Sequence, residues 1–156
     1  MKINLGTLTI ASPAFDHGGL IPTRYTGSGD GVSPPLVWSN PPAGTKSFAL
    51  VSDDPDAPLI TGFPHWVAYG IPAEATELAE NAQTGFVSGL NGIGTEGWVP
   101  PGPPPGHGDH FYYFHIYALN ADLGLAPGLT KDQLLATIDE HVIEQARVVG
   151  RYGNSA

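Results

Sequence analysis

Residues 110–119 read His-Phe-Tyr-Tyr-Phe-His-Ile-Tyr-Ala-Leu, a run that is aromatic or apolar at nearly every position. Both alternating faces of this run carry such side chains, whereas a strand buried on one side only would alternate more cleanly with polar residues. We therefore expect a central strand of a sheet, with both of its faces covered.

Shorter apolar or alternating stretches precede this run and are separated by Gly, Pro, Asn and Asp. They are residues 2–10, 36–38, 47–52 and 65–71. Many short strands with frequent turn signals indicate a β-sandwich or a β-barrel. The chain shows no repeat, long linker or second composition regime, so residues 1–156 are expected to form a single, mostly β domain.

One helix is expected near the C-terminus. Thr130-Lys131-Asp132-Gln133 has the form of a capping box, in which a hydroxyl and a Gln side chain satisfy the first backbone donors. An apolar stripe at helical spacing follows, and Gly150 is a natural stop. The stripe is Leu134, Ile138, Val142 and Val149. His141 is expected to pack on the apolar side of this helix, and residues 73–80 to form a second, shorter helical turn.

The charge balance excludes several classes of partner. Six Lys and Arg stand against 15 Asp and Glu, a formal net charge of −9, so no basic surface exists for a nucleic acid or an anionic membrane. A small anionic ligand is still compatible with this net charge when one local site outweighs the overall field.

The absence of Cys excludes disulfides and thiolate chemistry. Without a signal-peptide pattern or a long apolar run, we expect a cytoplasmic protein that is not integral to a membrane.

An acidic turn, Asp53-Asp54-Pro55-Asp56, follows the strand expected over residues 47–52. The proline restricts Asp54 to extended conformations, so the carboxylates at the strand end could project into a cleft. The alternative is that they only cap their own turn through Asx hydrogen bonds.

Two histidines stand where strands are expected to begin. His65 starts the strand over residues 65–71, and alternation would place it with Val67 and Tyr69, opposite Trp66. His110 starts the strand over residues 110–119. Each could take part in chemistry, and each could equally be a packed or surface histidine.

A third histidine, His107, lies between glycines in the loop before the last of these strands. Gly106 and its neighbours would let the backbone approach a ligand closely. His107 and His110, together with Asp54, have spacing compatible with a divalent ion, but a His-x-x-His pattern in a loop is a weak signal. We expect neither a metal nor a cofactor.

Residues 100–108 read Pro-Pro-Gly-Pro-Pro-Pro-Gly-His-Gly. Proline cannot donate to a strand ladder and has a fixed φ, so this segment must be a stiff, irregular loop. It could be a polyproline spacer. Because it leads directly into the most apolar strand, we expect it to shape the rim of a pocket.

Five segments carry a resemblance to a known family. They are SPAFDHGGLIPTRYT, VSPPLVWSNPPAGTKSFAL, DDPDAP, HWVAYGIPA and PPPGHGDHFYYFHIYAL, in that order. The chain resembles the phosphatidylethanolamine-binding protein family over residues 12–152, most closely its bacterial and archaeal branch of Raf kinase inhibitor-like proteins. The resemblance implies a Greek-key antiparallel β-sandwich with a C-terminal helix. It also implies a pocket for phosphate-type anions and small polar head groups. Members of this branch often form homodimers, so the resemblance implies a homodimer as well. It names no partner protein.

The resemblance also implies which residues form the pocket. Asp54 and Asp56 match the Asp-Pro-Asp-Ala-Pro motif, His65 matches the pocket histidine, and His110 matches the histidine of the family's Gly-x-His-Arg motif. Tyr112 would share a face with His110. The expected ligand-binding residues are Asp54, Asp56, His65, Pro104, Gly106, His107, His110 and Tyr112, with Pro103 and Pro105 also at the rim.

Two departures from the family pattern bear on the ligand. Phe111 stands where the family has Arg, and Gly102 where the bacterial branch often has Cys. Loss of a fixed positive charge favours a more neutral ligand, although alternation points Phe111 away from the site. We expect a non-catalytic binding module.

Two other functions compete with the binding module. The first is an enzyme that uses Asp54, His65 and His110 for acid–base isomerisation, cyclisation or hydrolysis of a small metabolite. The second is a kinase-inhibiting scaffold, for which no residue encodes a kinase contact.

Overall fold

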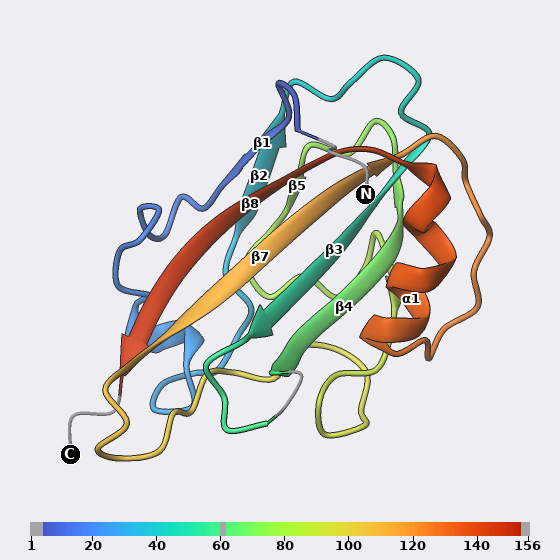
Figure 1. The fold of residues 1–156 in the computed structure, drawn as a ribbon. Helices are drawn as coiled ribbons and strands as arrows, with labels where there is room; N and C mark the ends of the chain where they lie inside the picture. The colour runs from blue at the N-terminus through green and yellow to red at the C-terminus, as the bar shows by residue number, and fades with distance from the viewer. Residues whose placement is uncertain (1–4, 60–61, 154–156) are drawn as a thin grey trace.

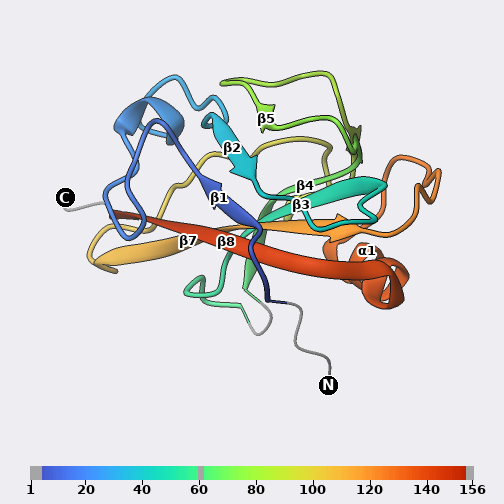
Figure 2. The ribbon, with the colours of Figure 1, turned by 90° about the horizontal axis from the view of Figure 1, so that it is seen from above.

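Two antiparallel sheets pack face to face in the computed structural model, which describes residues 5–59 and 62–153 (Figures 1 and 2). The larger sheet has the order β6-β4-β3-β7-β8 and the smaller one β1-β2-β5. The mostly β sandwich expected from the sequence is confirmed, and the sheets do not close into a barrel. The strands are β1 (Thr9–Ala11), β2 (Leu36–Ser39), β3 (Ser47–Asp54), β4 (Phe63–Pro72), β5 (Glu77–Leu78), β6 (Val87–Ser88), β7 (Asp109–Leu119) and β8 (Val142–Gly153).

Alternation along the strands divides the buried side chains into two clusters. The inner face of the larger sheet packs against the smaller sheet through Phe48, Leu50, Trp66, Phe114 and Ile116, which meet Leu36 and Trp38. The outer face packs against the helix α1 (Lys131–Ile138) through Ala49, Val51, Val67 and Tyr69. Burial of these two apolar faces is the main stabilising contribution to the fold.

The central strand is β3, not β7. β3 is buried at every position, because it pairs with β4 along one edge and with β7 along the other, and side chains cover both of its faces. β7 lies between β3 and β8, and only its inner face is fully buried, while Tyr113, His115 and Tyr117 on the outer face are half-buried. The expectation that residues 110–119 are covered on both faces is therefore wrong. The helix reaches only the Leu119 end of β7.

The helix begins as expected and ends earlier. Thr130 and Gln133 form the capping box, but α1 ends at Ile138 and a 3₁₀ turn (Asp139–His141) leads into β8. The helical spacing of Val142 and Val149 is a coincidence. Residues 142–153 pair instead with the full length of β7, where β-branched side chains are well accommodated.

Three smaller expectations also differ from the structure. His141 lies in the 3₁₀ turn and contacts the side chain of Asn120 at 3.0 Å, outside the core. Residues 73–80 form a turn and the short strand β5, not a helix. Of the strand expected over residues 2–10, only Thr9 and Ile10 are in β1, and residues 2–4 lie outside the described part of the chain.

The described residues contain no helix that is both long and apolar enough to span a membrane.

Gly150 tests the assignment of β8 as a strand. A Cβ at this position would lie 2.5 Å from Ile21 Cγ1 and 2.9 Å from Phe15 Cε2. We expect Gly150→Ala to lower the free energy of unfolding by about 1–3 kcal/mol through overpacking, as measured by urea denaturation. Gly102→Ala is the matched control, since nothing lies within 4 Å of its Cβ position. Unchanged or increased stability of Gly150→Ala would contradict the close packing of β8 against Ile21 and Phe15.

Candidate functional site

A cavity of about 360 Å³ is lined by residues from the end of β3 and from the starts of β4 and β7. These strand ends lie together at one end of the larger sheet (Figure 1). We call this cavity the Asp–His pocket. Its polar side chains are Asp54, His65, His110 and Tyr112, and the other walls are apolar or glycine. These walls are Ala57, Pro58, Leu59, Phe63, Val99, Pro100, Gly102, Pro103 and Pro104.

Asp54 and His110 form a buried pair at the base of the Asp–His pocket. The Nδ1 atom of His110 lies 2.7 Å from Oδ2 of Asp54, and both side chains are 5% exposed or less. The other oxygen, Oδ1, accepts a hydrogen bond from the backbone N–H of Asp56 at 2.8 Å. Both readings of the acidic turn therefore hold at once. Asp54 caps its own turn and also orients the imidazole of His110 through Nδ1.

His65 reaches the same pocket because β4 contains a bulge. Trp66 pairs with Ser52 and Pro64 pairs with Asp53, so His65 is an extra residue with no opposite partner in β3. A bulge of this kind redirects a side chain. The expectation that His65 shares a face with Val67 and Tyr69 is wrong for this reason. Its ring instead lies 5.2 Å from that of Tyr112, on the inner side of the sheet.

The protonation of His65 follows from its surroundings. Nδ1 lies 2.6 Å from the carbonyl oxygen of Val99, which can only accept, so Nδ1 carries the proton. The backbone N–H of Val99 in turn donates to the carbonyl of His65 at 2.9 Å. Burial lowers the pKa of the His65 ring. The hydrogen bond from Nδ1 to the Val99 carbonyl and the negative charge of Asp54 have a smaller, opposing effect. The neutral ring then offers Nε2 as a hydrogen-bond acceptor.

Tyr112 provides a donor. Its side chain is buried beside His65 and His110. Burial raises the pKa of the phenol, and the negative charges of Asp54 and Asp56 raise it further. The hydroxyl therefore keeps its proton over the whole physiological range.

Several residues expected to bind ligand do not line the Asp–His pocket. Asp56 holds the turn against β7 by accepting a hydrogen bond from the backbone N–H of Phe111 at 2.9 Å. Gly106, His107 and Pro105 are also outside the lining, although the ring of His107 lies 5.8 Å from that of His110.

Sequence reasoning missed the apolar wall formed by Phe63, Leu59 and Val99. Its only sequence signal was the proximity of these residues to the acidic turn, His65 and the proline loop.

Phe111 points away from the Asp–His pocket, as alternation predicts, and is 40% exposed.

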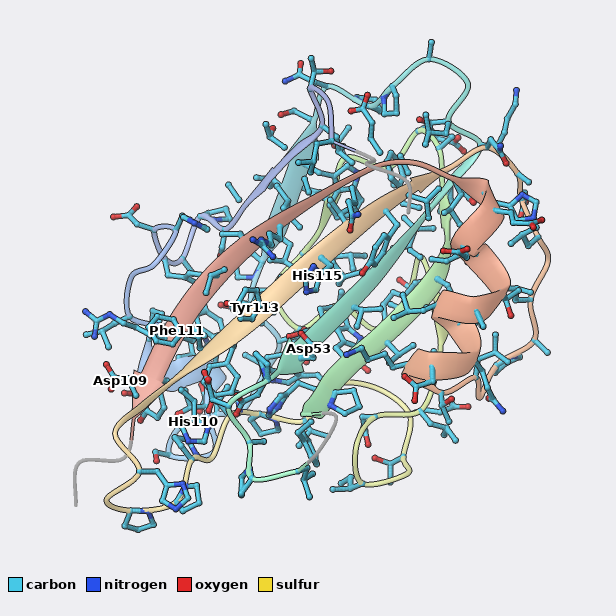
Figure 3. The ribbon with its side chains drawn as sticks, in the orientation of Figure 1. Asp53, Asp109, His110, Phe111, Tyr113 and His115 are labelled. Atoms are coloured by element: carbon cyan, nitrogen blue, oxygen red, sulfur yellow. The ribbon has the colours of Figure 1, made fainter. Side chains whose placement is uncertain are left out.

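Asp53, the neighbour of Asp54, also faces away from the Asp–His pocket. Figure 3 shows it near His115 on the outer face of the larger sheet, where its oxygens lie 2.5 Å from Lys131 Nζ and 3.5 Å from His115 Nε2. Burial raises the pKa of Asp53, but the nearby His115 ring and the hydrogen-bonded Lys131 ammonium group outweigh this effect, and the net pKa is lowered. The acidic turn is thus divided between two faces.

Two features of the described residues limit the chemistry of the pocket. No Lys or Arg lines it, so it has no fixed positive charge. No group of three or more His, Asp or Glu in residues 5–59 and 62–153 is placed to hold a metal ion. His115 lies 3.5 Å from Asp53 on the outer face, and Nδ1 of His17 accepts a hydrogen bond from the backbone N–H of Val149.

The fold and the pocket define a two-sheet sandwich with a ligand-sized cavity at the end of the larger sheet where β3 ends and β4 and β7 begin. Residues 11–153 match the family described as phosphatidylethanolamine-binding protein, and the chain belongs to this family.

Similar proteins come from several bacteria. A protein of Mycobacterium tuberculosis, named as a candidate lipoprotein, LppC, is 42% identical over 147 residues, covering 93% of this chain and 72% of its own. A crystal structure from Chlamydia trachomatis, described as a phosphatidylethanolamine-binding protein homologue, has a TM-score of 0.90 at 39% identity. It covers 97% of this chain and 99% of its own. YbcL of Escherichia coli has a TM-score of 0.88 at 30% identity, with coverage of 94% and 98%.

The buried state of His65 predicts how it titrates. We expect its ring resonances, followed by NMR, to have a midpoint below that of the same residue in the urea-unfolded chain. Because the unfolded state binds this proton more readily, the free energy of unfolding should fall as the pH falls below about 6.5. Replacement by Gln should reduce that dependence. A midpoint at or above the unfolded value would contradict the buried, neutral assignment.

Proposed function

We propose that this chain is a small-ligand-binding protein whose Asp–His pocket takes an anionic or polar head group. The observation that carries the proposal is the convergence of Asp54, His65, His110 and Tyr112 in one ligand-sized cavity. Cavities of a few hundred Å³ with mostly apolar walls and a few convergent polar groups are typical of small-molecule sites.

The polar groups complement a head group that both donates and accepts. Tyr112 donates through its hydroxyl, and neutral His65 accepts through Nε2. A phosphate monoester with one remaining proton, or a hydroxylated acid, offers both functions. The apolar walls, including Phe63 and Val99, would take a compact apolar part of the same ligand.

The absence of Lys and Arg from the lining sets a limit on ligand charge. A fully ionised dianion would meet no fixed cation in this pocket, and the net charge of −9 also disfavours it. We therefore favour weakly acidic or zwitterionic head groups of the phosphoethanolamine type over inorganic phosphate dianion.

Ligand binding is tested by NMR titration with acetate, inorganic phosphate and phosphoethanolamine. We expect saturable shifts of the ring resonances of His65 and His110, with His17 and His141 unaffected, and the strongest response to phosphoethanolamine. If no probe moves His65 and His110 at millimolar concentration, the head-group site is refuted.

Tyr112→Phe measures the contribution of the donor. Loss of one hydrogen bond of about 1 kcal/mol should weaken phosphoethanolamine binding about fivefold. Tyr113→Phe is a matched control on the same strand, since Tyr113 stacks on His115 on the opposite face. Equal effects of the two variants, or none from Tyr112→Phe, would remove Tyr112 from the site.

The Asp54–His110 pair supports a second candidate, an acid–base enzyme. A carboxylate that orients an imidazole is an arrangement suited to general acid–base catalysis. For hydrolysis, ³¹P NMR of the bound phosphoethanolamine would show inorganic phosphate accumulating with the wild-type protein but not with His110→Gln. An unchanged spectrum supports binding without turnover of this ester.

A further inference from the structure

The outer face of the larger sheet is only partly covered. α1 packs on β3 and β4 and reaches only the Leu119 end of β7. Toward the other end of β7 the outward side chains stay at the surface, and Figure 3 shows Phe111, Tyr113 and His115 in a row along this strand. We call this part of the outer face the aromatic–arginine face. Its residues are Leu20, Phe111, Tyr113, His115, Arg147 and Arg151.

Two exposed apolar side chains lie on either side of Arg151 in this face. Phe111 on β7 is opposite Arg151 in the strand register and is 40% exposed. Leu20 pairs with Arg151 from the other side and is 57% exposed. Ile21 lies against Gly150 on the inner side of the sheet, so alternation turns Leu20 outward. Large apolar side chains that gather at one place on a surface, rather than singly, indicate an interaction site.

The aromatic–arginine face differs in charge from the rest of the chain. The outward positions of β7 and β8 carry Arg147, Arg151 and a single acidic residue, Asp109, whereas the whole chain has a net charge of −9. Asp109 is already paired with Arg151 at 2.8 Å. One positive charge, that of Arg147, is therefore left over on this face.

Arg147 is held in place and has no acidic partner. It is opposite His115 in the strand register, its side chain is exposed, and its Cζ lies 5.6 Å from the centroid of the Tyr113 ring. Within residues 5–59 and 62–153, no carboxylate forms an ion pair with it. A guanidinium positioned over an aromatic ring keeps its charge available for a carboxylate.

We propose that the aromatic–arginine face binds an acidic protein segment that also carries an apolar side chain. A carboxylate of the segment pairs with Arg147, and the apolar side chain packs on Phe111 and Leu20. The distant acidic residues of the chain are screened over about 8 Å at physiological ionic strength, so they do not prevent this contact.

The charge of the face favours an acidic partner over a second copy of this chain. Two copies joined by a two-fold axis through this face would bring like charges together, which opposes association. The face is also separate from the Asp–His pocket, because none of its residues lines that pocket. The inference therefore does not depend on the head-group site proposed above.

Binding is tested by NMR titration with the synthetic peptide acetyl-Glu-Glu-Phe-Glu-Glu-Leu-Glu-amide. We expect saturable shifts of the ring signals of Phe111 and Tyr113 and of the Nε–H signal of Arg147, while the ring signals of His65 stay in place. No shift at millimolar peptide overturns the proposal. A peptide with Lys in place of every Glu is the charge control, and equal or tighter binding of this peptide also overturns it.

Arg147→Gln measures the contribution of the charge. It should weaken binding of the acidic peptide about three- to fivefold at low ionic strength and reduce the dependence of binding on salt. Lys46→Gln is the matched control, since Lys46 is also exposed, has no ion-pair partner in the described part of the chain, and lies beside Leu119 at the far end of β7. Equal effects of the two variants would reflect net charge alone and contradict the proposed contact. Arg147→Gln should leave phosphoethanolamine binding unchanged.

Phe111→Ser measures the contribution of the apolar contact. It should weaken binding of the acidic peptide about tenfold, whereas Ile93→Ser, at an apolar side chain that is 65% exposed in a loop, should have no effect. Wild-type affinity of Phe111→Ser would overturn the proposal. If the Phe111 and Tyr113 signals instead shift with protein concentration in the absence of peptide, the face joins copies of this chain and the proposed partner is wrong.

Discussion

Side-chain alternation along β3, β4 and β7, together with the extra residue that β4 contains at His65, decides which polar groups meet in the Asp–His pocket. On β3, Asp54 faces inward and Asp53 outward, and on β7 the inner positions include His110 and Tyr112. Without the bulge, His65 would project toward α1 and the pocket would lose its acceptor. A strand has a strict period of two, so a single inserted residue moves a side chain from one face to the other.

The division of the acidic turn gives its two neighbouring carboxylates different roles. Asp53 forms an ion pair with Lys131 on the outer face, close to His115, and this pair ties the start of α1 to the sheet. Asp54 is paired with His110 on the inner side and is part of the cavity wall. The larger sheet thus separates an ion pair on its outer face from the Asp–His pocket on its inner side, although Asp53 and Asp54 are adjacent in the chain.

The sequence predicted most strands and failed where two patterns coincide. Residues 142–149 carry apolar side chains at helical spacing, yet they are rich in β-branched residues and pair with β7 in the structure. Local spacing cannot reveal that β7 has an unpaired edge. The same limit applies to residues 110–119, whose apolar outer face suggested a central strand, although α1 is too short to cover it. The capping box at Thr130 was predictable because it involves only neighbouring residues.

The residues alone indicate a mostly β, acidic protein without thiols. The order of the sequence motifs additionally indicates the family, and it identifies Asp54, His65 and His110 as candidate site residues. Those conclusions depend on composition and on short segments, which local chemistry governs. The convergence of the acidic turn with two imidazoles depends on strand register, on the bulge and on the packing of the proline loop. These are long-range contacts between segments tens of residues apart, and they come into being only when the sheets assemble.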